Sequence, residues 1–303
     1  MENLTAEGGN YTRFKQSLIE EWDIFFAALN IFFSITASLS NALILIALHK
    51  VTSIYPPTKL LFRCLGVTDL CVGLISQPFY AIRKLPLMTN LNHREIIDMI
   101  FAISTLVLSA VSILTSTAIS VDRLLALIMG MRYKQVVTLR RVRALISFFW
   151  ILSCSLGALF LFSPGQININ MLITLIILCL LTSIMSYTKI YLLLRHHQIQ
   201  LHENLQQQGQ PPNGGGMPLN VARYKKTVSS IAWVQLVLLS CYLPFSVGLF
   251  LSVNDLLNLP EILLDVTISL LYVNSSLNPI IYCWKIKGVR QAVKDAVKFN
   301  CCR

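Results

Sequence analysis

The sequence has few charged residues and many apolar ones. Of its 303 residues, 13% are Asp, Glu, Lys or Arg, whereas 55% are hydrophobic. Several uncharged windows are long enough to cross the roughly 30 Å hydrocarbon core of a bilayer as a single helix. This composition excludes an ordinary water-soluble domain and indicates an integral membrane protein.

Cysteine is absent from the polar segments that connect these windows. Six of the eight cysteines lie within or at the ends of apolar windows, and the other two end the chain. A disulfide framework in the connecting loops is therefore excluded, and no spacing resembles a zinc site. Residues 1–20 lack the apolar core of a cleavable signal peptide, so we expect the first span to act as the insertion signal.

Seven membrane spans can be drawn from the apolar windows. Five windows fit one helix each: 24–48, 64–82, 99–121, 227–254 and 266–284. The window 144–188 is long enough for two helices, and the turn signal SPGQININ at 163–170 divides it. We therefore predict an all-α fold, a bundle of seven transmembrane helices.

Lys and Arg are distributed asymmetrically along the chain. If the N-terminus is extracellular, 20 of the 25 basic residues fall on the cytoplasmic side, and ten of the 14 carboxylates fall outside. Cytoplasmic loops retain an excess of Lys and Arg, so we predict this orientation in the cell membrane. The net charge of +11 then marks a face that meets membrane lipid and argues against nucleic acid as a partner.

Polar segments precede and interrupt the predicted seven-helix bundle, 24–284. The tail 1–23 is predicted to be extracellular, with glycosylation acceptors at Asn3 and Asn10. The alternative is that these two sequons arose by chance in a polar tail. The segment 197–220 is rich in Gln, Gly and Pro and is predicted to be a flexible cytoplasmic linker.

The C-terminal segment, 285–303, is predicted to form a short amphipathic helix on the cytoplasmic membrane surface. Its apolar residues share one helical face, and its basic residues lie elsewhere. Cys301 and Cys302 are candidate palmitoylation sites that would add a second anchor. An ordinary disordered basic tail is the alternative.

The last span carries polar side chains within an uncharged window. Asn274, Asn278 and Tyr282 follow one another at intervals of four residues, so they share one helical face. Pro279 deprives the carbonyl group one turn earlier of its donor, which creates a need for another partner. This face must point into the bundle, where we expect Asp69 to meet it. The alternative is polar contact between helices with no further function.

Five short motifs lie in register, each on its own span: SN at 40–41, LGVTD at 65–69, DRL at 122–124, CYLP at 241–244 and NPIIY at 278–282. Together they resemble the rhodopsin-like (class A) G protein-coupled receptors over about residues 24–299. The resemblance implies a receptor for an extracellular ligand that activates a heterotrimeric G protein, is not an enzyme and requires no cofactor. The alternatives are an ion-coupled transporter or channel, and a structural or decoy membrane protein.

The resemblance also implies four groups of functional residues. G protein coupling would rest on Asp122, Arg123, Met131, Tyr187 and Tyr282. The activation switch would comprise Tyr242, Pro244, Asn278 and Pro279. A sodium ion, as a negative allosteric modulator, would be held by Asp69, Ser112, Asn274, Ser275 and Asn278. The ligand pocket would be lined by Asp98, Thr105, Ser109, Tyr242, Phe245, Ile268 and Tyr272.

Departures from the family pattern narrow the ligand class. Thr105 stands in place of the amine-binding aspartate and Tyr272 in place of the retinal-binding lysine, which disfavours aminergic and light-sensing receptors. The remaining pattern is nearest the melanocortin, cannabinoid, lysolipid and adenosine receptors, so a peptide, a lipid or a small molecule is expected. Asp98 and Glu95 favour a cationic ligand group or a divalent cation, unless they are solvated acids at a helix end.

The sixth span lacks the acid that often holds the DRL arginine in the resting state of this family. The segment RYKKT at 223–227 offers basic residues and a tyrosine instead. We therefore expect a weakly latched resting state with some constitutive activity.

Overall fold

The structure is a computed structural model of the chain. It describes the backbone of residues 2–285, except for 53, 86–90, 163–165, 208–218, 255 and 257–259, and then of 290, 291 and 293. Within these ranges, side chains are not described for 2–19, 91–92, 197–198, 201–207, 219–235, 282, 284 and 285. The predicted modification sites Asn3, Asn10, Cys301 and Cys302, the side chain of Tyr282 and most of the predicted C-terminal helix therefore lie outside the described residues.

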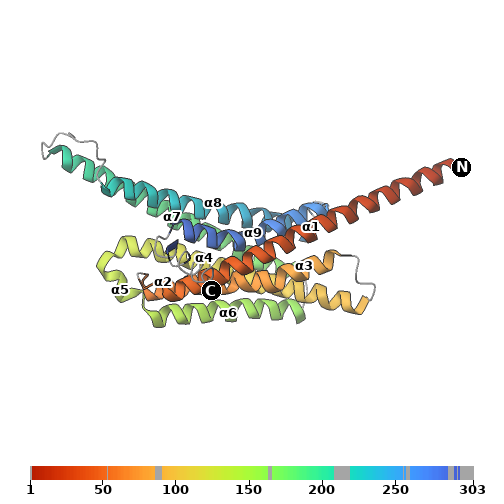
Figure 1. The fold of residues 1–303 in the computed structure, drawn as a ribbon, viewed down its shortest axis with the longest axis horizontal. Coiled ribbons are helices and arrows are strands. Elements are labelled where there is room, and N and C mark those ends of the chain that lie inside the picture. The colour runs from red at the N-terminus through yellow and green to blue at the C-terminus, as the bar shows by residue number, and fades with distance from the viewer. Residues whose placement is uncertain are drawn as a thin grey trace, which may run out of the picture.

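The described regular structure is entirely helical (Figure 1). Six spans are single helices: α1 (Glu2–Lys50), α4 (Leu91–Met129), α6 (Leu139–Phe162), α7 (Gln166–Gln207), α8 (Leu219–Val253) and α9 (Glu261–Lys285). The second span combines α2 (Pro56–Cys71), the π-helical turn η1 (Val72–Ser76) and α3 (Gln77–Lys84). Two short elements follow α4, η2 (Gly130–Arg132) and α5 (Tyr133–Val136). The predicted all-α fold with seven bundle helices is confirmed.

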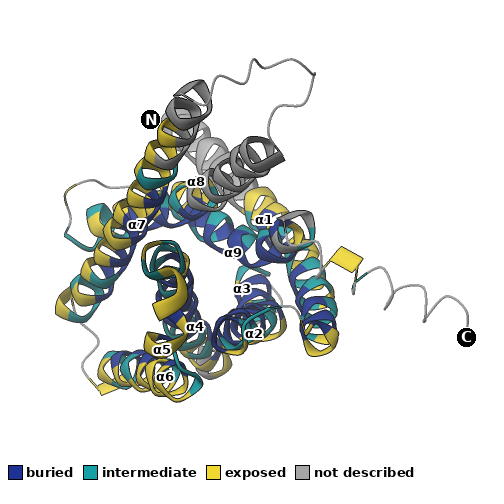
Figure 2. Ribbon diagram, turned by 90° about the vertical axis from the view of Figure 1, so that its left-hand side faces the viewer, coloured by how far each residue is buried: buried dark blue, intermediate teal, exposed yellow. Residues whose placement is uncertain are grey.

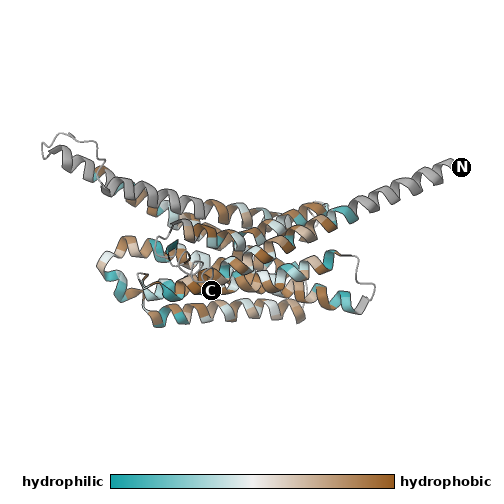
Figure 3. Ribbon diagram, in the orientation of Figure 1, coloured by the Kyte–Doolittle hydropathy of each residue, from teal (hydrophilic) through white to brown (hydrophobic). Residues whose placement is uncertain are grey.

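Six of these spans have a described part that is long and apolar enough to cross a membrane. The described part of α9 is not among them, because Asp265 and a run of Asn and Ser residues lower its mean hydropathy. Exposed apolar side chains cover the outside of the bundle, including Phe32, Leu39 and Ile151. Figure 3 places hydrophilic residues mainly toward the ends of the bundle, as expected when lipid surrounds its middle.

Helix α4 runs through the centre of the bundle, with its neighbours in a closed ring around it (Figure 2). It contributes to all three clusters of buried apolar side chains, through Ala110, Ile119 and Phe101 respectively. Helix α9 packs between α1 and α8. This arrangement brings polar residues of the second span, α4 and α9 to a common interior.

The second span changes its helical geometry where Pro78 follows the π-helical turn. Proline cannot donate a backbone hydrogen bond, and such a missing bond is one cause of local rewinding. Ser34 Oγ donates to the carbonyl group of Gly73 at 2.6 Å. A Cβ atom at Gly73 would lie 2.7 Å from Ser38 Oγ, so this close approach of α1 requires glycine.

The predicted start of the flexible linker, residue 197, was wrong. Helix α7 continues to Gln207, and α8 begins at Leu219. The residues at 199–207 are mostly good helix formers, such as Leu and Gln, and the first glycine occurs at 209. The helix therefore has no local reason to end where the polar composition begins.

Candidate functional site

Asp69 is completely buried in the middle of the bundle and accepts three side-chain hydrogen bonds. Ser275 Oγ donates to Oδ1 at 2.8 Å, and Asn278 Nδ2 donates to Oδ2 at 2.8 Å. Ser112 Oγ lies 3.3 Å from Oδ1. The carboxylate thus joins α2 to α9 and α4. Four of the five residues predicted to surround sodium are in direct contact.

The fifth residue, Asn274, is 1% exposed, and neither polar atom of its side chain has a hydrogen-bond partner among the described residues. The described partners of Asp69 are all uncharged. A buried carboxylate without a compensating cation is costly. One carboxylate with nearby hydroxyl and amide oxygens fits a hard monovalent cation. Among the described residues no cluster of three His, Cys, Asp or Glu offers a site of the transition-metal kind.

Asn41 of α1 completes this region, although we assigned it no role from the sequence. Pro279 cannot donate to the carbonyl group of Ser275, four residues before it. Asn41 Nδ2 donates to that carbonyl oxygen at 2.9 Å and to the Ala37 carbonyl oxygen at 2.9 Å. The sequence indicated that a partner was needed, whereas the packing of α1 against α9 determined which residue supplies it.

The predicted activation switch lies on α8 and α9, next to the Asp69 group. Pro244 and Pro279 both lie inside their helices. Tyr242 is 2% exposed, and its phenol interacts with Ser112. Asn278 is one of the donors to Asp69. The switch residues and the predicted sodium ligands are therefore in physical contact.

Asp122, at the inner end of α4, is buried and has three partners. Tyr133 OH donates to Oδ1 at 2.5 Å, and Thr58 Oγ1 donates to Oδ2 at 3.0 Å. Arg123 Nη2 donates to the same Oδ2 at 2.8 Å. Tyr133 and Thr58 were not predicted from the sequence, because a hydroxyl group at the start of a helix carries no signal of its partner. These two hydroxyl groups hold Asp122 independently of the arginine.

Arg123 is held less firmly than Asp122. Its side chain is 41% exposed, and its guanidinium carbon lies 6.0 Å from the centre of the Phe62 ring. Met131 on η2 is 94% exposed, and Tyr187 is buried on α7. The inner end of the bundle thus presents a cation and a large apolar side chain to the cytoplasm.

Most of the predicted ligand pocket is closed by packing. Its buried members are Thr105, Ser109, Tyr242, Phe245 and Tyr272. The hydroxyl groups of Thr105 and Tyr272 lie 2.7 Å apart, which ties α4 to α9. Asp98 is nearer the surface, where its Oδ1 pairs with Arg83 Nε at 2.8 Å.

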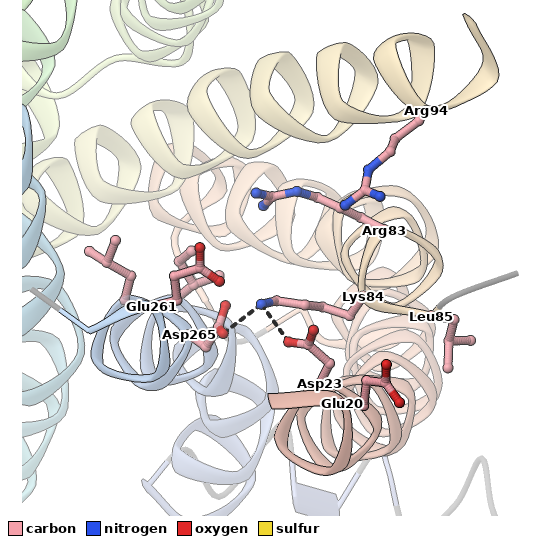
Figure 4. Close-up of a pocket in the computed structure, with 10 residues that line it drawn as sticks. Glu20, Asp23, Arg83, Lys84, Leu85, Arg94, Glu261 and Asp265 are labelled. Atoms are coloured by element: carbon pink, nitrogen blue, oxygen red, sulfur yellow. Dashed lines mark hydrogen bonds and ion pairs between the residues drawn. The ribbon is translucent and has the colours of Figure 1, made fainter. Parts of the chain in front are cut away.

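A cavity of about 440 Å³ opens at the outer end of the bundle (Figure 4). Ile268 is the predicted pocket residue that lines it. Its charged lining comes from four spans: Glu20, Asp23, Arg83, Lys84, Arg94, Glu261 and Asp265. All of these residues fall on the predicted outer side, but nothing in the sequence indicates that they converge.

Lys84 joins three helices at the floor of this cavity (Figure 4). Its Nζ lies 2.6 Å from Asp265 Oδ2 on α9 and 2.8 Å from Asp23 Oδ1 on α1. Tyr80 OH donates to the other oxygen of Asp265 at 2.8 Å. Both Asp265 and Tyr80 are buried, so this is a desolvated ion pair with an additional hydrogen bond.

Replacing Lys84 with methionine should destabilise the folded protein by about 3 kcal/mol, because the buried Asp265 would lose its cation. Thermal unfolding of the purified protein would report this loss. The double variant Lys84→Met/Asp265→Asn should recover most of the stability, since it removes the buried unpaired charge and leaves only Asp23, whose side chain is partly exposed to water. A single variant as stable as the unmutated protein would contradict this assignment of the ion pair.

The fold and these buried groups define the class of protein: a seven-helix membrane receptor, with a carboxylate at the centre of the bundle and an Asp-Arg pair at its inner end. The profile of the family described as 7 transmembrane receptor (rhodopsin family) matches residues 40–170 and 163–282. The chain belongs to this family. It is therefore a G protein-coupled receptor and a multi-pass protein of the cell membrane, without enzymatic activity, and the transporter or channel alternative is set aside.

Individual receptors show distant similarity. The chain is 30% identical to human adenosine receptor A2b over 140 residues, which covers 46% of this chain and 41% of that receptor. It is 26% identical to melanocortin receptor 4 of Danio rerio over 267 residues, covering 85% and 79%. It is 24% identical to human melanocortin receptor 5 over 324 residues, covering 99% and 93%. The predicted resemblance to adenosine and melanocortin receptors is confirmed.

Proposed function

We propose that this receptor converts the binding of an extracellular ligand into nucleotide exchange on a heterotrimeric G protein, and that Arg123 is the group that turns toward the G protein. The geometry of the Asp122–Arg123 pair carries the proposal. Arg123 has one contact to a carboxylate and remains partly exposed, and an ion pair of this kind contributes only about 0–1 kcal/mol. Asp122 retains Thr58 and Tyr133 when the arginine leaves. The free-energy cost of releasing Arg123 from Asp122 is therefore small.

Constitutive exchange is the first expected result. The sixth span has no acid at 223–227 to hold Arg123, and the side chains there lie outside the described residues. Cells that co-express the receptor with a panel of G proteins carrying exchange reporters should show basal exchange above that of receptor-free cells for at least one G protein. Normal surface expression with no basal exchange on any G protein of the panel would contradict the prediction that Arg123 is only weakly held in the resting state.

We also propose that the Asp69 group binds sodium in the resting state. Three observations support it: the uncompensated buried carboxylate, the unpartnered Asn274 side chain and the contact with the activation switch through Asn278. A ligand shifts an equilibrium only through different affinities for its two states. Sodium would therefore oppose activation by binding the resting state more tightly.

The ligand is a separate question, because the two kinds of relative carry the names of chemically unlike ligands, adenosine and melanocortin. Peptide, lipid and small-molecule ligands all remain compatible with family membership. The charged lining of the outer cavity supplies the evidence that distinguishes them. Glycosylation at Asn3 and Asn10, and palmitoylation at Cys301 and Cys302, stay predictions.

A further inference from the structure

Charged side chains of both signs line the outer cavity (Figure 4). Arg83 and Arg94 come from α3 and α4, on one side of Lys84. Glu20, on α1, lies on the other side of Lys84, and Glu261, on α9, lies apart from Glu20. A ligand that enters between these helices therefore meets an arginine on one side and a glutamate on the other.

Several of these charges are already neutralised within the protein. Lys84 is paired with Asp23 and Asp265, and this group of three residues forms the floor of the cavity. Arg83 is paired with Asp98 and stacks on a phenylalanine ring, 5.0 Å from its centre. The pairing of Asp98 also removes the main reason to expect a purely cationic ligand.

Three lining charges have no ion pair with any residue that the structure describes. They are Arg94, Glu20 and Glu261. An arginine next to a second arginine favours an anion that can accept hydrogen bonds from both, and carboxylates favour a cation that donates to them. The unpaired groups therefore favour a ligand that carries both a negative and a positive charge.

The size and lining of the cavity restrict that ligand further. A volume of about 440 Å³ falls within the range of small-molecule pockets. Its apolar lining is limited to Leu85, Leu264 and Ile268, which is too little to bury a lipid chain. A single α-amino acid carries its two charged groups on the same carbon atom, whereas Arg94 and Glu20 come from different helices. A short peptide with free ends carries its charges at its two ends.

From these observations we infer that the cavity binds a short unblocked peptide, of about two to four residues by cavity size, with its carboxylate at Arg94 and its ammonium group at Glu20. This inference rests on the proposed receptor function and names the ligand class of that same receptor. Arg83, held by Asp98, adds positive potential to the carboxylate end. Occupation of the site would connect α1 and α4 through one molecule.

The test uses the purified full-length receptor and four mixtures of tripeptides, each with glycine at both ends and every amino acid in the middle. One mixture is unblocked, one is N-acetylated, one is C-amidated and one is blocked at both ends. Thermal stabilisation as a function of concentration gives an apparent affinity for each mixture. We expect the unblocked mixture to bind best and each single block to lower the apparent affinity about tenfold, because each removes a charge-assisted contact.

Variants assign each end of the peptide. Arg94→Gln should lower the affinity for the unblocked mixture and make it insensitive to C-amidation. Glu20→Gln should make it insensitive to N-acetylation. The control is Glu21→Gln, which removes an exposed charge next to Glu20 that does not line the cavity, and it should behave like the unmutated protein.

Equal stabilisation by all four mixtures, stabilisation by none, or tighter binding of either singly blocked mixture would overturn the ligand class. These outcomes leave the receptor function standing as long as basal exchange depends on Arg123. Loss of that dependence would overturn the proposed function whatever the tripeptides do. The two failures are therefore distinguishable.

Discussion

Replacing Arg123 with alanine is expected to abolish G protein activation, so that basal exchange falls to that of cells without the receptor. The arginine is the cation at the inner end of α4, and its release from Asp122 is the step that we propose for coupling. Surface expression should change little, because Asp122 keeps its hydrogen bonds from Thr58 and Tyr133. The lost ion pair is partly exposed and contributes little stability.

Two comparisons make this experiment specific. Arg143→Ala removes an exposed positive charge from α6 on the same cytoplasmic side and should retain basal exchange. Arg123→Lys keeps the charge but lacks the planar group with several donors, so it should signal only weakly. Full signalling by Arg123→Ala at normal surface expression would refute the proposed role of the arginine.

Basal exchange and the affinity of any agonist are expected to be several-fold lower in sodium than in N-methyl-D-glucamine at the same ionic strength. The resting bundle has an uncompensated carboxylate at Asp69 and an unpartnered Asn274 side chain; a bound cation would compensate the carboxylate and take the Asn274 amide oxygen as a ligand. Because coupling between two ligands is reciprocal, an agonist would in turn weaken sodium binding. Asp69→Asn should remove the sodium dependence.

Ser76→Ala is a matched control for that variant. Ser76 is a buried polar residue of the same span, and its hydroxyl group has no partner among the described residues. Its removal should leave the sodium dependence intact. Equal basal exchange in sodium and in the organic cation, in the unmutated receptor, would mean that the Asp69 group only joins helices.

The sequence alone was sufficient for the number of spans, their approximate positions and the class of protein. These features depend on local properties: the length of each apolar window, the turn signal at 163–170 and the spacing of short motifs within a span. The contact between Asp69 and the face of α9 was also predictable in outline. A carboxylate within lipid needs polar partners, and the last span carries amide and hydroxyl side chains on one helical face.

Contacts that depend on the rotation of a helix about its axis could not be predicted from the sequence. The π-helical turn before Pro78 adds a residue to one turn, which rotates the following segment by about 100° relative to a regular α-helix. Tyr80 and Lys84 lie beyond that turn, and both contact Asp265 on α9. If the second span is drawn as a regular α-helix, Tyr80 and Lys84 are therefore placed on a different face from the one that contacts α9.

What the sequence by itself determined was the membrane fold, its orientation and the set of buried polar groups that require partners. Only the tertiary structure decided which partners they have: Asn41 for the Ser275 carbonyl group, Tyr133 and Thr58 for Asp122, and Lys84 for Asp265. The physical reason is that hydropathy and helical periodicity are properties of neighbouring residues. A hydrogen bond between helices depends instead on the rotation, depth and closest approach of two segments that are distant in the chain.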